Sequence, residues 1–185
     1  MVAWSALLLP LALSVVAVFF ASFAVHMVLA WHAAHYNPVP DEPAARAALK
    51  GLPPGQYIVP HCVDPKQMAD PEMARRFEEG PVLTIWSRAP GGMKRGPFLG
   101  QWIVYVLVVT AIVAYLARAS TPAGSDFLHV LQIVGTTSWL AYAWQRPADS
   151  IWKGRPWGST MRTIVEGLLY AVVTGAIFAW QWPAA

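Results

Sequence analysis

The sequence predicts an all-α membrane protein with four transmembrane helices and a small cytoplasmic element between the first two. More than half of the 185 residues are hydrophobic and only 12% are charged, the reverse of a soluble domain with a solvated surface. Four stretches meet the length of roughly 20 apolar residues that a helix needs to cross a bilayer. Lysine and arginine are concentrated in two of the three connections between these stretches.

The first predicted helix covers residues 1–35 and contains an apolar run from Val2 to Trp31. It has no basic residues at its start, and its apolar run is far longer than the roughly 7–15 residues of a signal peptide. We therefore interpret it as a permanent anchor. A bend is expected at Pro10, because the proline ring removes one backbone hydrogen bond.

Residues 36–97 form the predicted cytoplasmic element. Two segments, DEPAARAALKG and DPEMARRFEEG, have an acidic start and a terminal glycine, and the second places Asp70 as N-cap, Pro71 at the first helical position and Gly80 beyond the end. These signals predict two short helices. The segments GQYIVPHCV and PVLTIWS suit short strands, which either pair as a β-hairpin or lie along the lipid headgroups.

The remaining helices are predicted over 98–118, 127–145 and 161–182, with a second cytoplasmic loop at 146–160. The stretch from Phe127 to Trp144 is the shortest of the four. In the last helix a stripe of small residues recurs every four positions: Thr163, Gly167, Ala171, Gly175 and Ala179. Such a stripe lets a neighbouring backbone approach closely, so we expect it to face the other helices of a four-helix bundle.

The distribution of positive charge predicts the orientation in the membrane. Of the 13 lysine and arginine residues, all except Arg118 lie in the first and third connections or, as Arg162 does, at the helix start that follows them. Because such residues resist translocation when they flank a span, both basic connections are expected in the cytoplasm and both termini in the periplasm. Tryptophans near the predicted helix ends are expected to form an aromatic belt at the headgroups: Trp4, Trp31, Trp102, Trp144, Trp152, Trp157, Trp180 and Trp182.

The candidate functional site is centred on Glu166, which interrupts the otherwise apolar stretch MRTIVEGLLYAVV. A charged carboxylate facing lipid would cost about 2.5–3.5 kcal/mol on insertion scales, so the side chain is expected to face protein. His26 lies at a similar predicted depth, and we predict that the two residues interact. Further polar residues at this depth are Ser22, Gln101, Tyr105, Ser138, Tyr142 and Tyr170.

Two interpretations of this polar set are open. It is either a site open to the cytoplasm that holds a proton, a cation or a headgroup, or a set of interfacial residues that satisfy one another or snorkel. No cofactor is expected, because His129 and His26 lie at opposite ends of their helices and one haem cannot reach both. His32 and His35, with Asp41 or Glu42, are weak metal candidates, since two histidines do not make a site.

Catalysis and nucleic-acid binding have less support. His61 and Cys62 are adjacent, and in an extended segment their side chains point to opposite faces, although a thiolate catalyst with a distant histidine is an alternative. The chain has no glycine-rich phosphate loop after a strand, no HExxH and no GxSxG. Its aromatic residues flank lipid spans instead of forming a stacking platform, so no nucleic-acid partner is expected.

At GQYIVPHC, EEGPV and IWKGRPW the chain resembles a set of small bacterial inner-membrane proteins without an assigned activity. The shared segments include the patterns GxYxxPxC and IWxGRPW, and the resemblance covers most of the cytoplasmic element and the last span. The resemblance implies a bacterial inner-membrane address and no activity.

Three functions remain as expectations. The first is a non-enzymatic accessory or scaffold subunit, which would dock on a larger membrane complex through the small-residue stripe and the aromatic-rich connections. The second is a small transporter or ion-binding protein that uses Glu166 and His26. The third is a membrane-bound enzyme that uses Cys62 or His61.

Overall fold

The computed structural model describes residues 1–29, 31, 33–92 and 94–185. The chain divides into two compact units. The helical unit consists of Met1–Tyr36, Lys94–Ala148 and Pro156–Ala185, and the smaller unit consists of Asn37–Met93 and Asp149–Arg155.

Three helices of the helical unit are long and apolar enough to cross a membrane. They are α1 (Trp4–Phe23) with the π-helical turn η1 (Ala24–Val28), α4 (Arg95–Ser120) and α7 (Trp157–Trp180). α1 runs through Pro10 without an interruption. The fourth predicted span, α5 (Phe127–Ala143), has 17 residues, a length of about 25 Å against a hydrocarbon core of about 30 Å. The predicted count of four spans is therefore not confirmed.

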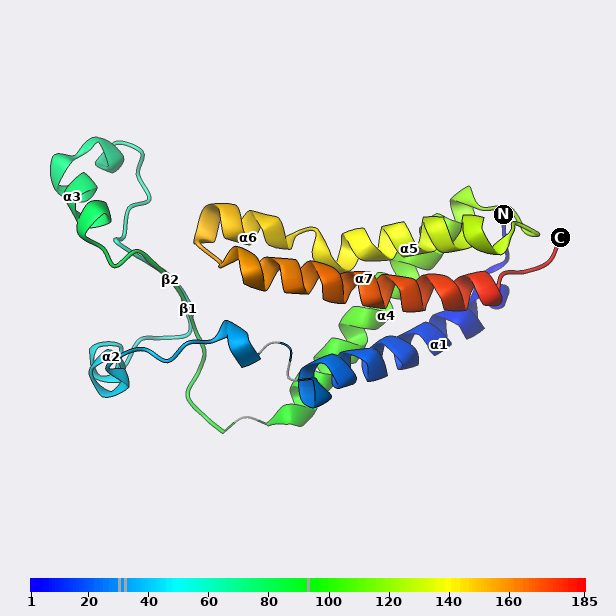
Figure 1. The fold of residues 1–185 in the computed structure, drawn as a ribbon, viewed down its shortest axis with the longest axis horizontal. Coiled ribbons are helices and arrows are strands. Elements are labelled where there is room, and N and C mark those ends of the chain that lie inside the picture. The colour runs from blue at the N-terminus through cyan, green and yellow to red at the C-terminus, as the bar shows by residue number, and fades with distance from the viewer. Residues whose placement is uncertain (30, 32, 93) are drawn as a thin grey trace. The chain divides into compact units, whose positions relative to one another are not determined.

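The helices of this unit contact one another in a closed order (Figure 1). α5 packs along α7, α1 packs against both α7 and α4, and α4 also packs against α5. The two chain termini lie at the same end of these helices (Figure 1). At that end Gly124 N donates a 2.8 Å hydrogen bond to Pro183 O, and Arg118 Nε donates a 2.6 Å bond to Val2 O. These bonds join both ends of the chain to α4 and to the α4–α5 connection.

The predicted small-residue stripe on α7 is the surface that packs on α5. A Cβ atom at Gly167 would lie 2.7 Å from the Cβ of Ala143, and one at Gly175 would lie 2.9 Å from Leu131 Cδ1 and 3.2 Å from Gly135 N. Distances this short leave no room for a side chain. The contacts also show that α5 and α7 run antiparallel, and they confirm the prediction that the stripe faces a neighbouring helix.

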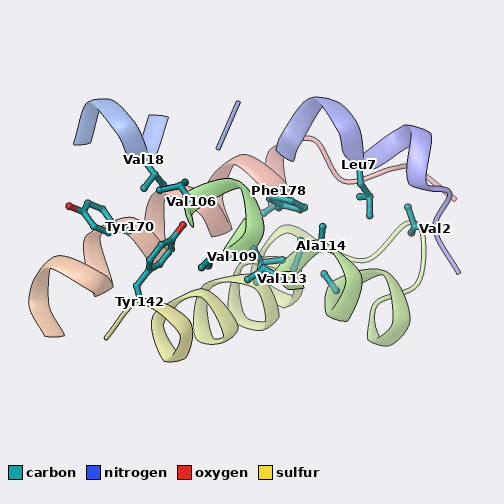
Figure 2. Close-up of a cluster of buried hydrophobic side chains, with 14 residues drawn as sticks. Val2, Leu7, Val18, Val106, Val109, Val113, Ala114, Tyr142, Tyr170 and Phe178 are labelled. Atoms are coloured by element: carbon teal, nitrogen blue, oxygen red, sulfur yellow. The ribbon is translucent and has the colours of Figure 1, made fainter. Parts of the chain in front are cut away.

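The core of the helical unit is built from side chains of α1, α4, α5 and α7, as Figure 2 shows. Its buried members include Leu7, Val18, Val106, Val109, Val113, Tyr142, Tyr170 and Phe178. The outer faces of the same helices carry large exposed apolar side chains such as Leu8, Phe20 and Val108. Lipid tails are as apolar as leucine, so such faces suit a bilayer.

The smaller unit contains α2 (Glu42–Ala48), β1 (Gly55–Val59), the 3-10 turn η3 (Gln67–Ala69), α3 (Pro71–Glu79) and β2 (Leu83–Ser87). The end of α6 (Arg146–Lys153) also belongs to it. The two strands pair antiparallel, with Gly55 opposite Ser87 and Val59 opposite Leu83. Of the two alternatives for the strands, the structure therefore shows the paired one, with η3 and α3 inserted between the partners.

The predicted helix signals of this unit are confirmed. The carboxylates of Asp41 and Asp70 accept 2.9 Å hydrogen bonds from the backbone N–H groups of Ala44 and Glu72, which caps α2 and α3. Gly80 follows α3 with a φ of +65°, a conformation that favours glycine. Short polar side chains at these positions satisfy N–H groups that the helix itself leaves without partners.

Candidate functional site

Glu166 is buried in the helical unit, with 8% of its surface exposed. It lies on α7 next to Gly167, whose close contact with α5 fixes the rotation of the helix. Its Oε1 atom lies 3.4 Å from Nδ1 of His26. The prediction that Glu166 faces protein and lies near His26 rested on the shared depth of the two residues and on the position of Glu166 beside the small-residue stripe, and it agrees with this geometry.

His26 lies in the π-helical turn η1, where Leu29 N donates to Ala24 O, five residues earlier, over 2.9 Å. Its Nδ1 atom also lies 2.9 Å from Ser22 O. A backbone carbonyl can only accept, so the proton of this hydrogen bond is on Nδ1. The His26 side chain is 45% exposed, and it therefore links the buried carboxylate to the surface of the unit.

Tyr170 lies one turn after Glu166 on α7, and its hydroxyl donates a hydrogen bond to Glu166 Oε1. Ser22, whose backbone oxygen bonds His26, is buried, as is Tyr170. Glu166 is thus held between a hydroxyl donor from its own helix and the imidazole of His26 in η1. The network places four of the predicted residues together: Ser22, His26, Glu166 and Tyr170.

An aromatic cluster forms the wall of this network on the α4 and α5 side. The ring of Tyr170 lies 5.5 Å from that of Tyr142 and 6.2 Å from that of Trp102. Tyr105 stacks on Trp102 at 5.3 Å and meets Tyr142 at 6.1 Å. Figure 2 shows Tyr142 and Tyr170 side by side. The four helices of the unit therefore all contribute to one polar and aromatic site.

The structure changes the membership of the predicted site at two positions on α4. Gln101 is exposed and lies outside the buried cluster. Trp102, which the sequence analysis assigned to the aromatic belt, is part of the cluster instead. Trp102 precedes Tyr105 by three residues, a spacing that puts both on one face of a helix, and this spacing was the available signal. Ser138 is fully buried on α5, one turn before Tyr142.

The weak metal candidates do not form a site in the described part of the chain. His32 lies outside the described residues, and His35 ends the 3-10 turn η2 (Ala33–His35). Asp41 is engaged in capping α2, and the Glu42 carboxylate lies 3.9 Å from the Arg46 guanidinium. The described residues contain no group of three histidine, cysteine or acidic side chains that could hold a metal ion.

Cys62, the nucleophile of the enzyme alternative, is buried in the smaller unit. Cys62 is 7% exposed, and its Sγ lies 3.9 Å from the backbone oxygen of Asp64. His61 is exposed, in agreement with the expectation that the two side chains point to different faces. A catalytic thiol reacts as the thiolate, which an adjacent base or a lowered pKa provides, whereas the contact described for Cys62 is with a backbone oxygen, which is not a base.

Three helices of spanning length and composition support a membrane-embedded protein. Comparison of the chain with protein-family models, with curated proteins and with solved structures gave no match. Its function is therefore inferred from the chemistry of the Glu166 site alone.

Proposed function

We propose that this chain is a membrane protein of the transporter or ion-binding class, in which Glu166 takes up and releases a proton through His26. The observation that carries the proposal is the contact between a carboxylate that is 8% exposed and an imidazole that is 45% exposed. Ionisable side chains inside membrane segments are costly and mark ion pathways by default. Histidine is the side chain whose charge changes most readily near neutral pH.

The neighbours of Glu166 suit a proton-exchanging group. The Tyr170 hydroxyl donates to the carboxylate, and a hydroxyl can also accept when the carboxyl is protonated. Tyr170 can therefore keep Glu166 in place in both protonation states. The apolar core beside the site makes an unpaired charge unfavourable, which couples the protonation of Glu166 to that of His26.

We also propose that α5 is a fourth, short span of a four-helix bundle. Near the end of α7, Trp182 Nε1 donates a 2.9 Å hydrogen bond to Pro122 O, which follows α4. The chain leaves α4 beside the end of α7 and must reach the start of α7, and α5 covers that path antiparallel to α7. If α7 spans a membrane, α5 crosses most of the same thickness.

We propose that the chain lies in a bacterial inner membrane with both termini on the periplasmic side. The proposal rests on the distribution of lysine and arginine residues. Cys62 is a poor reporter because it is buried, so single cysteines belong in a Cys62→Ser background. We expect an impermeant thiol reagent to label Ala123→Cys in intact cells and Ala89→Cys only after lysis. The reverse labelling pattern would show that both termini lie on the cytoplasmic side.

Proton uptake by Glu166 is tested by infrared difference spectroscopy of the purified protein as a function of pH. We expect a carboxylic-acid band that is lost in Glu166→Gln. The same band should shift in Tyr170→Phe, because this substitution removes the hydrogen bond from the Tyr170 hydroxyl to the Glu166 carboxyl. Glu78→Gln is the matched control, since Glu78 is an exposed carboxylate on α3. If every titrating band survives in Glu166→Gln, the carboxylate has a structural role and the proposal fails.

An accessory or scaffold subunit is the second candidate. The small-residue stripe on α7 does not support docking on a partner, because α5 of the same chain covers it. The remaining support is the exposed aromatic side chains Trp86 and Trp152, 53% and 83% exposed. Co-purification of a stoichiometric membrane partner that is lost in Trp152→Ala would favour this function.

A further inference from the structure

The smaller unit contains an apolar groove that the Glu166 site does not use. It has a volume of about 760 Å³, and its lining includes Leu49, Leu52, Tyr57, Val63, Trp86 and Trp152. Several of these side chains are strongly exposed, with Val63 at 70% and Trp152 at 83%. Exposed apolar surface that gathers in one place indicates a binding site more often than scattered apolar residues do.

The lining of the groove includes a cation, Lys153. The Lys153 ammonium lies 5.9 Å from the centre of the Trp86 ring and donates a 2.6 Å hydrogen bond to the Asp149 carboxylate. These two contacts fix its position on the groove wall. An ammonium group has three N–H donors, so a further acceptor can bind Lys153 while the bond to Asp149 is kept.

Chain connectivity places this wall close to a membrane surface. Lys153 precedes Trp157, the first residue of α7, by four residues, and four residues span at most about 14 Å when fully extended. The other wall includes β2, which ends at Ser87, and α4 begins at Arg95 after a connection of seven residues. The lengths of these connections therefore limit how far the groove can lie from the starts of the two spans, where tryptophan and lysine typically contact headgroups.

Charge is also sorted along this part of the chain. The residues next to the starts of α4 and α7 are mostly basic: Arg88, Lys94, Arg95, Lys153, Arg155 and Arg162, with Asp149 as the acidic exception. The acidic residues of the smaller unit lie mainly in and around α2 and α3: Asp41, Glu42, Asp64, Asp70, Glu72, Glu78 and Glu79. Five basic residues lie among these seven, Arg46, Lys50, Lys66, Arg75 and Arg76, so this region has only a small excess of negative charge. The membrane-proximal part thus complements an anionic lipid surface, to which each nearby lysine or arginine contributes about 1 kcal/mol of attraction.

We propose that the groove binds an anionic phospholipid, with an acyl chain along Leu49, Tyr57 and Trp86 and the phosphate at Lys153. The smaller unit then acts as a lipid-binding module at the membrane surface. This site is separate from Glu166, and neither proposal depends on the other.

The test uses the full chain in nanodiscs that contain photoactivatable phosphatidylglycerol or, in parallel, photoactivatable phosphatidylcholine. We expect severalfold more crosslinking of the phosphatidylglycerol probe to peptides that carry Tyr57, Trp86 and Trp152 than to the α3 peptide. Lys153→Gln should remove the preference for phosphatidylglycerol, and Trp86→Ala should reduce crosslinking of both probes. Lys66→Gln is the matched control, because it removes an exposed lysine of the same unit that does not line the groove.

Three results would overturn the proposal. Equal crosslinking of the two lipids would refute the anionic specificity, and equal labelling of the groove and α3 would refute the groove. Low labelling that rises when a co-purifying polypeptide is removed would assign the groove to a protein partner. Trp86→Ala is informative only while β1 and β2 remain paired, so hydrogen exchange of the strand amides accompanies it.

Discussion

The two units are held together by different kinds of contact. In the helical unit, apolar side chains from four helices are buried and two glycines let α5 and α7 touch. In the smaller unit, Cys62 is the single buried residue among the described residues between 37 and 92. Caps, exposed ion pairs and one antiparallel ladder hold its elements. Close packing of helices therefore determines the stability of the helical unit. Local polar interactions determine that of the smaller unit, and each of them contributes little.

The largest effect is expected where the helical unit is tightest. Gly175→Leu would force a side chain against backbone atoms at 3.2 Å, the amide nitrogen of Gly135 and the carbonyl oxygen of Leu131. Overpacking of this kind costs about 1–3 kcal/mol and occasionally more. We expect Gly175→Leu, and to a similar degree Gly167→Leu, to lower the thermal unfolding temperature in detergent strongly.

Gly100→Leu is the control for this prediction. A Cβ at Gly100 would meet nothing within 4 Å, and leucine is the better helix former, so its unfolding temperature should stay unchanged or rise. Equal behaviour of the Gly100 and Gly175 variants would mean that the α5–α7 contact does not determine the stability of this unit.

The next effect concerns polar contacts inside the helical unit. Glu166→Ala removes the acceptor of the buried Tyr170 hydroxyl and the neighbour of His26, and an unsatisfied buried donor costs about 1–3 kcal/mol. His26→Ala should cost less, because His26 is half exposed. In a double-mutant cycle, the two single losses should sum to more than the loss in the double variant, by about 0.5–3 kcal/mol. Strictly additive unfolding free energies would show that the pair is not coupled.

Much of this architecture could be predicted because its causes are local in the sequence. Asp70, Pro71 and Gly80 set the limits of α3 through their own backbone preferences, and the stripe on α7 follows from spacing alone. The proximity of Glu166 and His26 followed from depth. Three other features could not be predicted from local sequence patterns. Nothing in AVHMV marks a π-turn, and Trp102 suits a headgroup belt as well as a buried cluster. The pairing of β1 with β2 is a contact between distant segments.

A smaller effect is expected in the smaller unit from the cap of α3. Asp70→Ala removes the acceptor for Glu72 N, and loss of an N-cap costs about 0.5–2 kcal/mol. Hydrogen exchange in the full chain should therefore accelerate in α3 while α7 keeps its protection. Asp70→Asn, which retains a side-chain oxygen, should behave like the original protein. If the alanine and asparagine variants exchange alike, the cap does not stabilise α3.

The smallest effect concerns the exposed charges of α3. Hydrogen bonds from Arg75, and next from Arg76, hold the pKa of the Glu72 carboxyl below its ordinary value of 4.5, and desolvation opposes them only in part. Because the pKa is lowered in the folded state, these bonds stabilise α3 fully above pH 4.5. The stabilisation is lost as the pH falls through the folded pKa. Water screens so exposed a group, so the shift itself is the better measurement.

Carbon-13 NMR of the chain labelled at glutamate carboxyls measures that shift, with Glu72→Gln assigning the resonance. In the original protein Glu72 should titrate below 4.5, and in Arg75→Gln its pKa should rise toward 4.5, because Arg75 provides two of its hydrogen bonds. Lys66→Gln also removes one positive charge, but not one that contacts Glu72, so it should leave the titration in place. If both variants shift Glu72 equally, general charge and not the Arg75 bond sets its pKa, and the ion pairs of α3 contribute less to the smaller unit than the geometry indicates.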